Sequence, residues 1–292
     1  MTEAKEYFHH SLLAFGHGEV RLAAELAAKA ARQEPESRVF SQAAKYLARV
    51  LAEGRAQVYD VPAAFSAFIQ SGGNIQLYEA VSSALRRVYQ EYDSLSLLDI
   101  GAGDGRALLP ALTANVVRLE VIEPSAAMLG ALRYALDECR LPYCAFNGTL
   151  QQFTQHSKDQ REVIQATFSL QSVHPAERPA LFRWLRAHGR RLLIVEFDVP
   201  QFTEMYAPEH VQYVLERYER GLAEYPDDDL VAQGFLIPVM FGYFDPTAER
   251  TNYEQPIRTW MEQLQEAGFT QVTAHSLSDY WWATAFLIDA RH

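Results

Sequence analysis

From residue 95 onward the chain alternates short apolar runs with stretches of helical periodicity. A helix-length connection between two strands lets them run parallel, whereas a tight turn makes them antiparallel. The alternation therefore predicts an α/β fold in which helices cover a parallel sheet. The five apolar runs expected as strands cover residues 95–100, 116–122, 143–146, 163–170 and 192–197.

The end of the chain replaces this alternation with a hairpin. A helix is expected at 256–267, and Gly268 ends it. Two further apolar runs, 269–277 and 281–290, have only three residues between them, too few for a crossover. The expected sheet is therefore doubly wound and seven-stranded, with five parallel strands and a C-terminal antiparallel hairpin.

The first part of the chain shows helical periodicity alone. Residues 3–54 predict a hairpin of two amphipathic helices with a break at 34–37. Further helices are expected at 62–70 and 75–92. We therefore expect a helical domain over residues 1–92 and a sheet domain over 93–292, with an acidic, aromatic insertion at 199–255.

The net charge of −11 comes mostly from this insertion, which holds eleven acidic and three basic residues. Binding a nucleic-acid backbone requires a basic patch, so the composition argues against a nucleic-acid partner. The acidic segment is either an ordinary solvated surface or a region that attracts a cationic substrate. Small-molecule or protein partners are expected instead.

Membrane, metal and disulfide chemistry have little support in the sequence. No run approaches the roughly 18 consecutive apolar residues of a membrane span, and the polar start lacks a signal pattern, so we expect a cytoplasmic protein without membrane contact. Cys139 and Cys144 are the only cysteines. We expect both to be reduced thiols, and no metal site.

A glycine-rich turn, Gly101-Ala102-Gly103-Asp104-Gly105, follows the first expected strand. Such a turn brings the backbone close to a ligand at the carboxyl ends of the strands. A dinucleotide fingerprint would need glycine at position 106, where the chain has Arg106, and the Gly-Lys-Ser/Thr ending of a phosphate loop is absent. The turn by itself still allows several cofactors.

Four motifs in order resemble the class I S-adenosylmethionine-dependent methyltransferases, whose fold is Rossmann-like. They are LLDIGAGDG, VIEPS, NGTLQQF and FSLQSVHP, each at the end of an expected strand. The resemblance implies S-adenosylmethionine as cofactor, with Glu123 accepting hydrogen bonds from the ribose hydroxyls and Asp99 bracing the turn or binding the ammonium group. It departs at Thr149, where an acidic residue is common. The cofactor-binding residues implied are Tyr78, Asp99, Gly101, Ala102, Gly103, Glu123, Pro124, Gly148, Thr149, Leu150, Ser169 and Leu170.

Two residues are candidates for catalysis by the same resemblance. Methyl transfer depends mainly on alignment and exclusion of water, and a base is needed only when the acceptor carries a proton that must leave. His174, after the fourth strand, is a candidate base or else begins a helix. Glu196, at the end of the fifth strand, positions a hydroxyl or ammonium group or else caps the strand.

The elements outside the sheet are expected to cover the acceptor. In this family such elements form a lid, so residues 1–92 are expected as an N-terminal helical lid, and the aromatic stretches 59–68 and 235–244 would line a dry pocket. We expect a methyltransferase acting on a small or medium-sized metabolite, as in natural product biosynthesis, at oxygen, nitrogen or carbon. A non-methylating enzyme of the same fold, such as a cyclase, and a partner-docking protein stay open, as do a homodimer and contact with a carrier protein.

Overall fold

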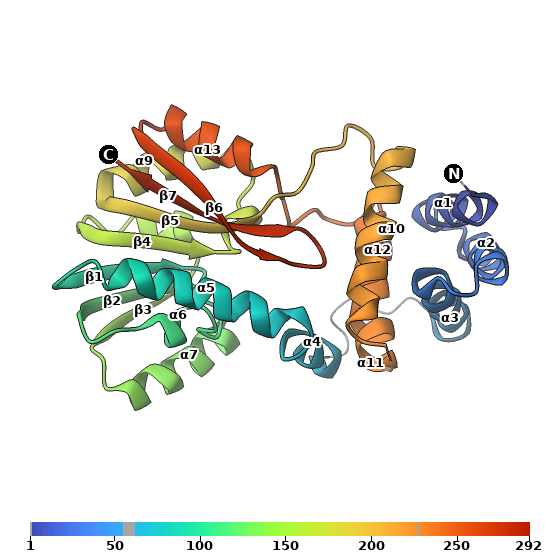
Figure 1. Ribbon diagram of the computed structural model, residues 1–292, viewed down its shortest axis with the longest axis horizontal. Coiled ribbons are helices and arrows are strands. Elements are labelled where there is room, and N and C mark those ends of the chain that lie inside the picture. The colour runs from blue at the N-terminus through green and yellow to red at the C-terminus, as the bar shows by residue number, and fades with distance from the viewer. Residues whose placement is uncertain (1, 55–61, 227) are drawn as a thin grey trace. The chain divides into compact units, whose positions relative to one another are not determined.

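A computed structural model describes residues 2–54, 62–226 and 228–292, and Figure 1 shows its elements. The chain forms two compact units, described separately below. The helical unit joins Met1–Ile75 to Phe202–Glu249, and the sheet unit joins Gln76–Gln201 to Arg250–His292.

The sheet unit confirms the predicted doubly wound, seven-stranded sheet. Its strands lie in the order β3-β2-β1-β4-β5-β7-β6, and β7 is antiparallel to both β5 and β6. The order reverses direction between β1 and β4, which places a topological switch point at their carboxyl ends. The strands are β1 Leu95–Ile100, β2 Val116–Glu123, β3 Tyr143–Asn147, β4 Arg161–Thr167, β5 Gly189–Phe197, β6 Gln271–Asp279 and β7 Thr284–Arg291.

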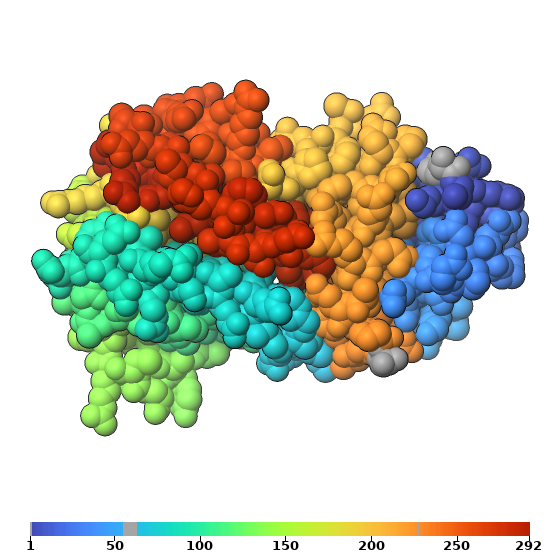
Figure 2. All heavy atoms as spheres, viewed as in Figure 1, coloured from blue at the N-terminus to red at the C-terminus, as the bar shows by residue number. Residues whose placement is uncertain are grey.

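Helices cover both faces of this sheet. A continuous apolar core joins the strands to Phe182 and Leu185 of α9 and to Trp260 and Leu264 of α13 on one face. In Figure 1, α9 and α13 lie on one side of the strands, and α5 and α7 lie on the other. In Figure 2, atoms of α5 (teal) and of the hairpin β6–β7 (red) both reach the surface of this unit. The helices are α5 Gly73–Tyr89, α6 Leu108–Ala111, α7 Ala126–Cys139, α8 Leu150–Thr154, the 3-10 turn η1 Leu170–Ser172, α9 Arg178–His188 and α13 Ile257–Glu266.

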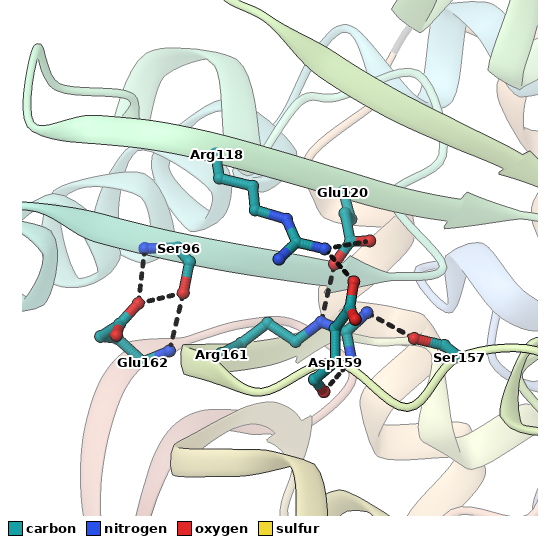
Figure 3. Close-up of polar contacts among 7 residues, drawn as sticks. All are labelled: Ser96, Arg118, Glu120, Ser157, Asp159, Arg161 and Glu162. Carbon is teal, nitrogen blue, oxygen red and sulfur yellow. Dashed lines mark hydrogen bonds and ion pairs between the residues drawn. The ribbon is translucent and has the colours of Figure 1, made fainter.

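The amino-terminal half of the sheet buries a network of ion pairs (Figure 3). The guanidinium of Arg161, which is 1% exposed, donates to Glu120 at 2.7 Å and to the Ser157 hydroxyl at 2.6 Å. Arg118 bonds both Glu120 and Asp159. Every buried charge in this network faces an opposite charge or a hydrogen-bond acceptor, which is the condition for burying it.

The helical unit packs around phenylalanine and tyrosine rings. Phe241 lies 4.8 Å from Phe15, 5.4 Å from Tyr46 and 6.3 Å from Phe8, measured between ring centroids. The long segment between β5 and α13 therefore supplies part of the core of this unit. Its helices are α1 Glu3–Gly16, α2 Val20–Gln33, α3 Arg38–Glu53, α4 Pro62–Ile69, α10 Pro208–Ala223, α11 Asp229–Val231, the π-helix η2 Ala232–Leu236 and α12 Ile237–Tyr243.

Acidic residues of the 199–255 segment cap other helices of the helical unit. The Glu219 carboxylate accepts hydrogen bonds from Ser37 and from the backbone N–H groups of Arg38 and Val39 at the start of α3. Glu224 accepts from the N–H of Gly73 at 2.8 Å, at the start of α5. These negative charges lie where helix N-termini favour them.

The structure corrects the prediction of a two-helix hairpin over residues 3–54. Three helices cover this range, because a break at residues 17–19 separates α1 from α2. Gly18 adopts a φ of +81° there, a left-handed conformation that ends α1. The break lies in a sequence that keeps helical periodicity on both sides.

The units also divide the chain differently from the expected boundary at residue 92. Most of α5 belongs to the sheet unit, where the Tyr89 hydroxyl bonds Gln165 of β4. Residues 202–249 cluster with the first 75 residues, whereas 199–201 and 250–255 stay with the sheet. In the described part of the chain no helix is both long and apolar enough to cross a membrane.

Candidate cofactor and acceptor site

The glycine turn after β1 packs tightly on one side and is open on the other. Gly101 and Gly103 have φ angles of +67° and +58°. A Cβ atom on Gly101 would lie 2.4 Å from the Cβ of Ser169, so no larger residue fits there. A Cβ on Gly103 would meet only the Met128 sulfur, at 4.0 Å, which leaves room for a ligand beside the backbone.

Glu123, the last residue of β2, contacts the glycine turn. Its two carboxylate oxygens accept hydrogen bonds from the N–H groups of Gly103 at 2.9 Å and Ser125 at 2.7 Å. Each carboxylate oxygen has a further lone pair, so the group can still accept hydrogen bonds from a ligand diol. The N–H of Gly148 donates to the Glu123 carbonyl at 3.2 Å, and this bond holds the next turn beside it.

Asp99 is buried beneath this turn without a cationic partner among the described residues. Its Oδ1 atom has no hydrogen-bond partner in the described structure. Burial raises the pKa of Asp99 to about 7, the Gln165 amide beside it lowers the pKa in part, and the charge of Glu123 raises it further. A buried polar atom without a partner calls for an explanation, and the ammonium role implied for Asp99 would supply one.

The turn after β3 is built as a capping box. The Thr149 hydroxyl accepts a hydrogen bond from the N–H of Gln152, and the Gln152 side chain accepts one from the N–H of Thr149 at 2.9 Å. The hydroxyl and the N–H of Thr149, the polar residue expected near the adenine, are therefore both engaged within the chain. Leu150, buried at the start of α8, supplies the apolar part of this turn.

Ser169 and Tyr78 border the glycine turn from two other elements. The Ser169 hydroxyl donates to the Ile100 carbonyl at 2.7 Å and so fixes the end of β4 against β1. Tyr78 lies in the first part of α5, and burial and the charge of Asp104 raise the pKa of its hydroxyl, whereas Arg106 lowers it. The structure thus brings the cofactor-binding residues named from the sequence to the carboxyl edge of the sheet, and their contacts with a cofactor stay a prediction.

Glu196 lies at the same edge and is 1% exposed. It accepts a hydrogen bond from the N–H of Gln171 at 3.1 Å. Burial raises the pKa of Glu196 to about 8; the Gln171 N–H lowers it, Glu254 raises it and Arg178 lowers it. Glu254 accepts from the Trp282 indole at 2.9 Å, and burial raises its pKa to about 7. Two carboxyl groups with perturbed pKa values thus act on each other near the end of β5.

Arg178 fixes the residues that carry Glu254. Its guanidinium donates to the carbonyls of Val173 at 3.1 Å and Tyr253 at 2.6 Å, and to the side-chain oxygen of Gln255 at 2.8 Å. The guanidinium carbon also lies 4.2 Å from the centre of the Trp260 ring. The segment before α13 is therefore tied to the loop after β4.

His174, the second residue predicted for catalysis, is exposed. Its Nδ1 accepts a hydrogen bond from the N–H of Ala176 at 3.2 Å, and its ring packs edge-on against Tyr253 at 5.0 Å. His174 lies between η1, which ends at Ser172, and α9, which begins at Arg178, so it does not begin a helix; its role as a base stays a prediction.

The sequence did not single out Phe168, Arg178 or Glu254. Phe168 has a φ of +51°, which no local pattern announces. In the sequence, Glu254 is one of eleven acidic residues in the 199–255 segment, and Arg178 follows another charged residue, Glu177, so neither is distinctive.

Of the aromatic stretch at 59–68, residues 59–61 lie outside the described residues. No group of three or more potential metal ligands occurs among the residues that the structure describes.

One family model matches most of the chain. Residues 37–274 match a family model described as a methyltransferase domain. No curated protein matches the sequence.

Solved structures share the fold at low sequence identity. Magnesium protoporphyrin IX methyltransferase (ChlM) from Synechocystis PCC 6803 with bound SAH aligns with a TM-score of 0.51 and 13% identity, over 80% of this chain and 96% of that one. The pyocyanin biosynthetic protein PhzM aligns with a TM-score of 0.51 and 15% identity, over 90% and 71%. The CMeT domain of the citrinin polyketide synthase aligns with a TM-score of 0.53 and 13% identity, over 92% and 69%.

Proposed function

The chain belongs to the methyltransferase domain family, whose methyl donor is S-adenosylmethionine, and we propose that it methylates a small or medium-sized organic acceptor. The observation that carries this proposal is the meeting of Glu123 with the glycine turn. The Glu123 carboxylate is fixed by the N–H of Gly103 at 2.9 Å, beside the open space at Gly103. A carboxylate that can accept hydrogen bonds from a diol thus lies beside free space at the backbone of Gly103, at the topological switch point of the sheet.

The residues at this edge fit the chemical groups of the donor. Glu123 offers lone pairs to the ribose hydroxyls, and the unpartnered oxygen of Asp99 offers an acceptor to the α-ammonium group. Leu150 and the turn around Gly148 supply an apolar contact for the adenine. When bound, S-adenosylmethionine supplies an electrophilic methyl group on a positively charged sulfur.

Glu196 is the group that we assign to take a proton from the acceptor. A hydroxyl or ammonium acceptor must lose its proton as the new bond forms, and a base works best when its pKa lies near the working pH. Burial raises the pKa of Glu196 to about 8, well above that of an ordinary carboxyl group. Backbone N–H groups of Gln171, at 3.1 Å, and of Leu170 hold the Glu196 carboxyl group in place.

Calorimetric titration with S-adenosylmethionine and with its demethylated product tests the donor site. We expect binding in the low micromolar range, and a loss of about tenfold or more in Glu123→Ala, because the variant removes a charged acceptor of two hydrogen bonds. Glu138→Ala is the matched control, since Glu138 is exposed on α7. Absence of binding to the folded chain would contradict the proposal.

A second experiment tests the reaction. Incubation with a methyl-labelled donor and a panel of small acceptors should give labelled products that carry one added methyl group. An acceptor converted without gain of the label would instead identify a non-methylating enzyme of the same fold.

A further inference from the structure

Four aromatic side chains form a row at the carboxyl ends of β4 and β5. We call this set the aromatic row: Tyr78, Phe168, Phe197 and Tyr280. The rings of Phe168 and Phe197 are nearly parallel, with centroids 4.5 Å apart and 15° between their planes. Phe197 and Tyr280 are 5.5 Å apart at 18°, and Tyr78 meets Phe168 edge-on at 6.2 Å.

Phe168 holds its place in the row through an unusual backbone. Its φ of +51° lies in the left-handed region, which a bulky residue seldom adopts. Two hydrogen bonds impose this conformation: the N–H of Phe168 donates to the Val195 carbonyl at 2.9 Å, and the Gln171 amide donates to the Phe168 carbonyl at 3.1 Å. Glycine would occupy the position without steric cost. A strained residue that the surrounding structure fixes in this way points to a role for its side chain.

The aromatic row begins beside the glycine turn that is assigned to the methyl donor. Ser169, next to Phe168, is the residue whose Cβ leaves no room for a side chain at Gly101. Tyr78, Phe168 and Phe197 are half-buried, whereas Tyr280 is buried. Parts of three rings are therefore accessible, and Phe168 connects them to Ser169 and the glycine turn assigned to the donor.

We propose that the aromatic row is the acceptor-binding wall of this enzyme, that it selects planar aromatic acceptors, and that Phe168 is the specificity-determining residue. This inference rests on the proposed function and adds the class of acceptor. Aromatic rings prefer offset-stacked or edge-on partners, and the row already contains both arrangements. An acceptor ring that joins it extends the same packing, while a saturated ring of equal size loses the ring-to-ring attraction.

The carboxyl groups of Glu196 and Glu254 lie at the same edge of the sheet. Glu196 directly precedes Phe197 on β5, and successive residues of a strand point to opposite faces. The Glu196 side chain therefore lies on the other face of β5 from the Phe197 ring, and the inference about the acceptor rests on the aromatic row alone.

The test compares two probes of similar size, 2-naphthol and its saturated analogue decahydro-2-naphthol. Both are titrated by nuclear magnetic resonance into the full chain saturated with S-adenosylhomocysteine, whose own affinity is measured first. We expect the intact chain to bind 2-naphthol about tenfold more tightly, as aromatic pairs would supply. Phe168→Leu should reduce this ratio to near one and leave the affinity for S-adenosylhomocysteine unchanged.

Trp184→Leu is the matched control. Trp184 is an aromatic residue of the same unit on α9, where it packs against Phe153, and its loss should leave the ratio at about tenfold. If Phe168→Leu does not fold, Phe168→Gly removes the same ring while it relaxes the backbone, and it should give the same loss of preference.

Equal affinity for the two probes in the intact chain, or an unchanged ratio in the Phe168 variants, would overturn the inference while normal binding of S-adenosylhomocysteine leaves the proposed function standing. No binding of S-adenosylhomocysteine would overturn both.

Discussion

Acidic side chains near the amino-terminal ends of the parallel strands have cationic partners, whereas the buried acidic side chains Asp99 and Glu196 at the carboxyl ends have none among the described residues. In the amino-terminal half, Glu120 lies 2.7 Å from Arg161, and Asp289 lies 2.7 Å from Arg191. At the carboxyl edge, Asp99 and Glu196 are buried more deeply than either, yet neither forms an ion pair with a described residue.

The pKa values follow this difference. Burial works against the charge of Asp289, but hydrogen bonds from Arg191 and Arg291 hold its pKa below the ordinary value. Burial without such partners raises the pKa of Asp99 to about 7 and that of Glu196 to about 8. Paired charges hold the sheet together at one end, whereas unpaired ones at the other end cost stability and remain available to a ligand.

The largest effect is expected from breaking the paired half. Arg161→Met leaves Glu120 buried without its main partner, and we expect a loss of about 3 to 5 kcal/mol in the free energy of unfolding. Urea unfolding followed by tryptophan fluorescence measures it, because all four tryptophans belong to the sheet unit. The double variant Arg161→Met/Glu120→Leu should recover most of the loss. A single variant as stable as the parent would contradict the assignment of this network.

Removing an unpaired charge should have the opposite sign. The folded protein binds the Asp99 proton up to a pKa of about 7, above the ordinary value of 3.8, so its contribution to stability is complete below pH 4 and is lost as the pH rises through 7. Asp99→Asn should therefore be more stable than the parent at pH 8, by about 2 to 4 kcal/mol. The measurement is urea unfolding at pH 5 and pH 8. A parent protein that gains stability over this range, with no change in the variant, would reject the unpaired state of Asp99.

The carboxyl pair at the end of β5 gives a smaller, kinetic effect. Glu254→Gln removes the negative charge that helps to raise the pKa of Glu196. The acidic limb of the kcat profile should move to lower pH by up to about one unit, since less repulsion opposes ionisation of the base. Glu254→Asp keeps the charge and should leave the limb in place. Identical profiles for parent and Glu254→Gln would separate Glu254 from the reaction.

The smallest effect is expected where a pair is exposed. Arg258 and Glu262 form an ion pair on α13, and the Arg258 side chain is 88% exposed. Arg258→Ala should change the free energy of unfolding by less than about 0.5 kcal/mol, because water and salt screen such pairs. A loss comparable to that of Arg161→Met would show that burial does not set the difference between the regions.

The sequence predicts the sheet well because its strands are continuous apolar runs. The expected bounds of β1, residues 95–100, agree with the structure, and β2 differs by one residue. The expected fourth strand, 163–170, is instead β4 Arg161–Thr167, because the chain leaves the extended conformation at Phe168. Errors concentrate where one backbone angle, as at Gly18 or Phe168, overrides an otherwise regular pattern.

The candidate site could be predicted only where its residues follow one another along the chain. The glycine turn and Glu123 belong to local motifs, and the structure brings them together. Two of the three acceptors of Arg178 lie 75 and 77 residues away from it. Glu254 belongs to a segment that the composition marks as surface. Tertiary packing places such residues, and a local sequence motif gives no information about tertiary packing.

The guanidinium of Arg178 is held by neutral groups and has no counterion in contact with it among the described residues. Its three acceptors, two backbone carbonyls and one amide oxygen, are neutral dipoles, so they solvate the guanidinium as a shell of water would without cancelling its charge. The uncancelled positive potential lies beside Glu196, which is the carboxyl group that it helps to ionise. Added salt, which weakens surface ion pairs, has little access to this buried cation. The pKa of Glu196 should therefore change little with ionic strength.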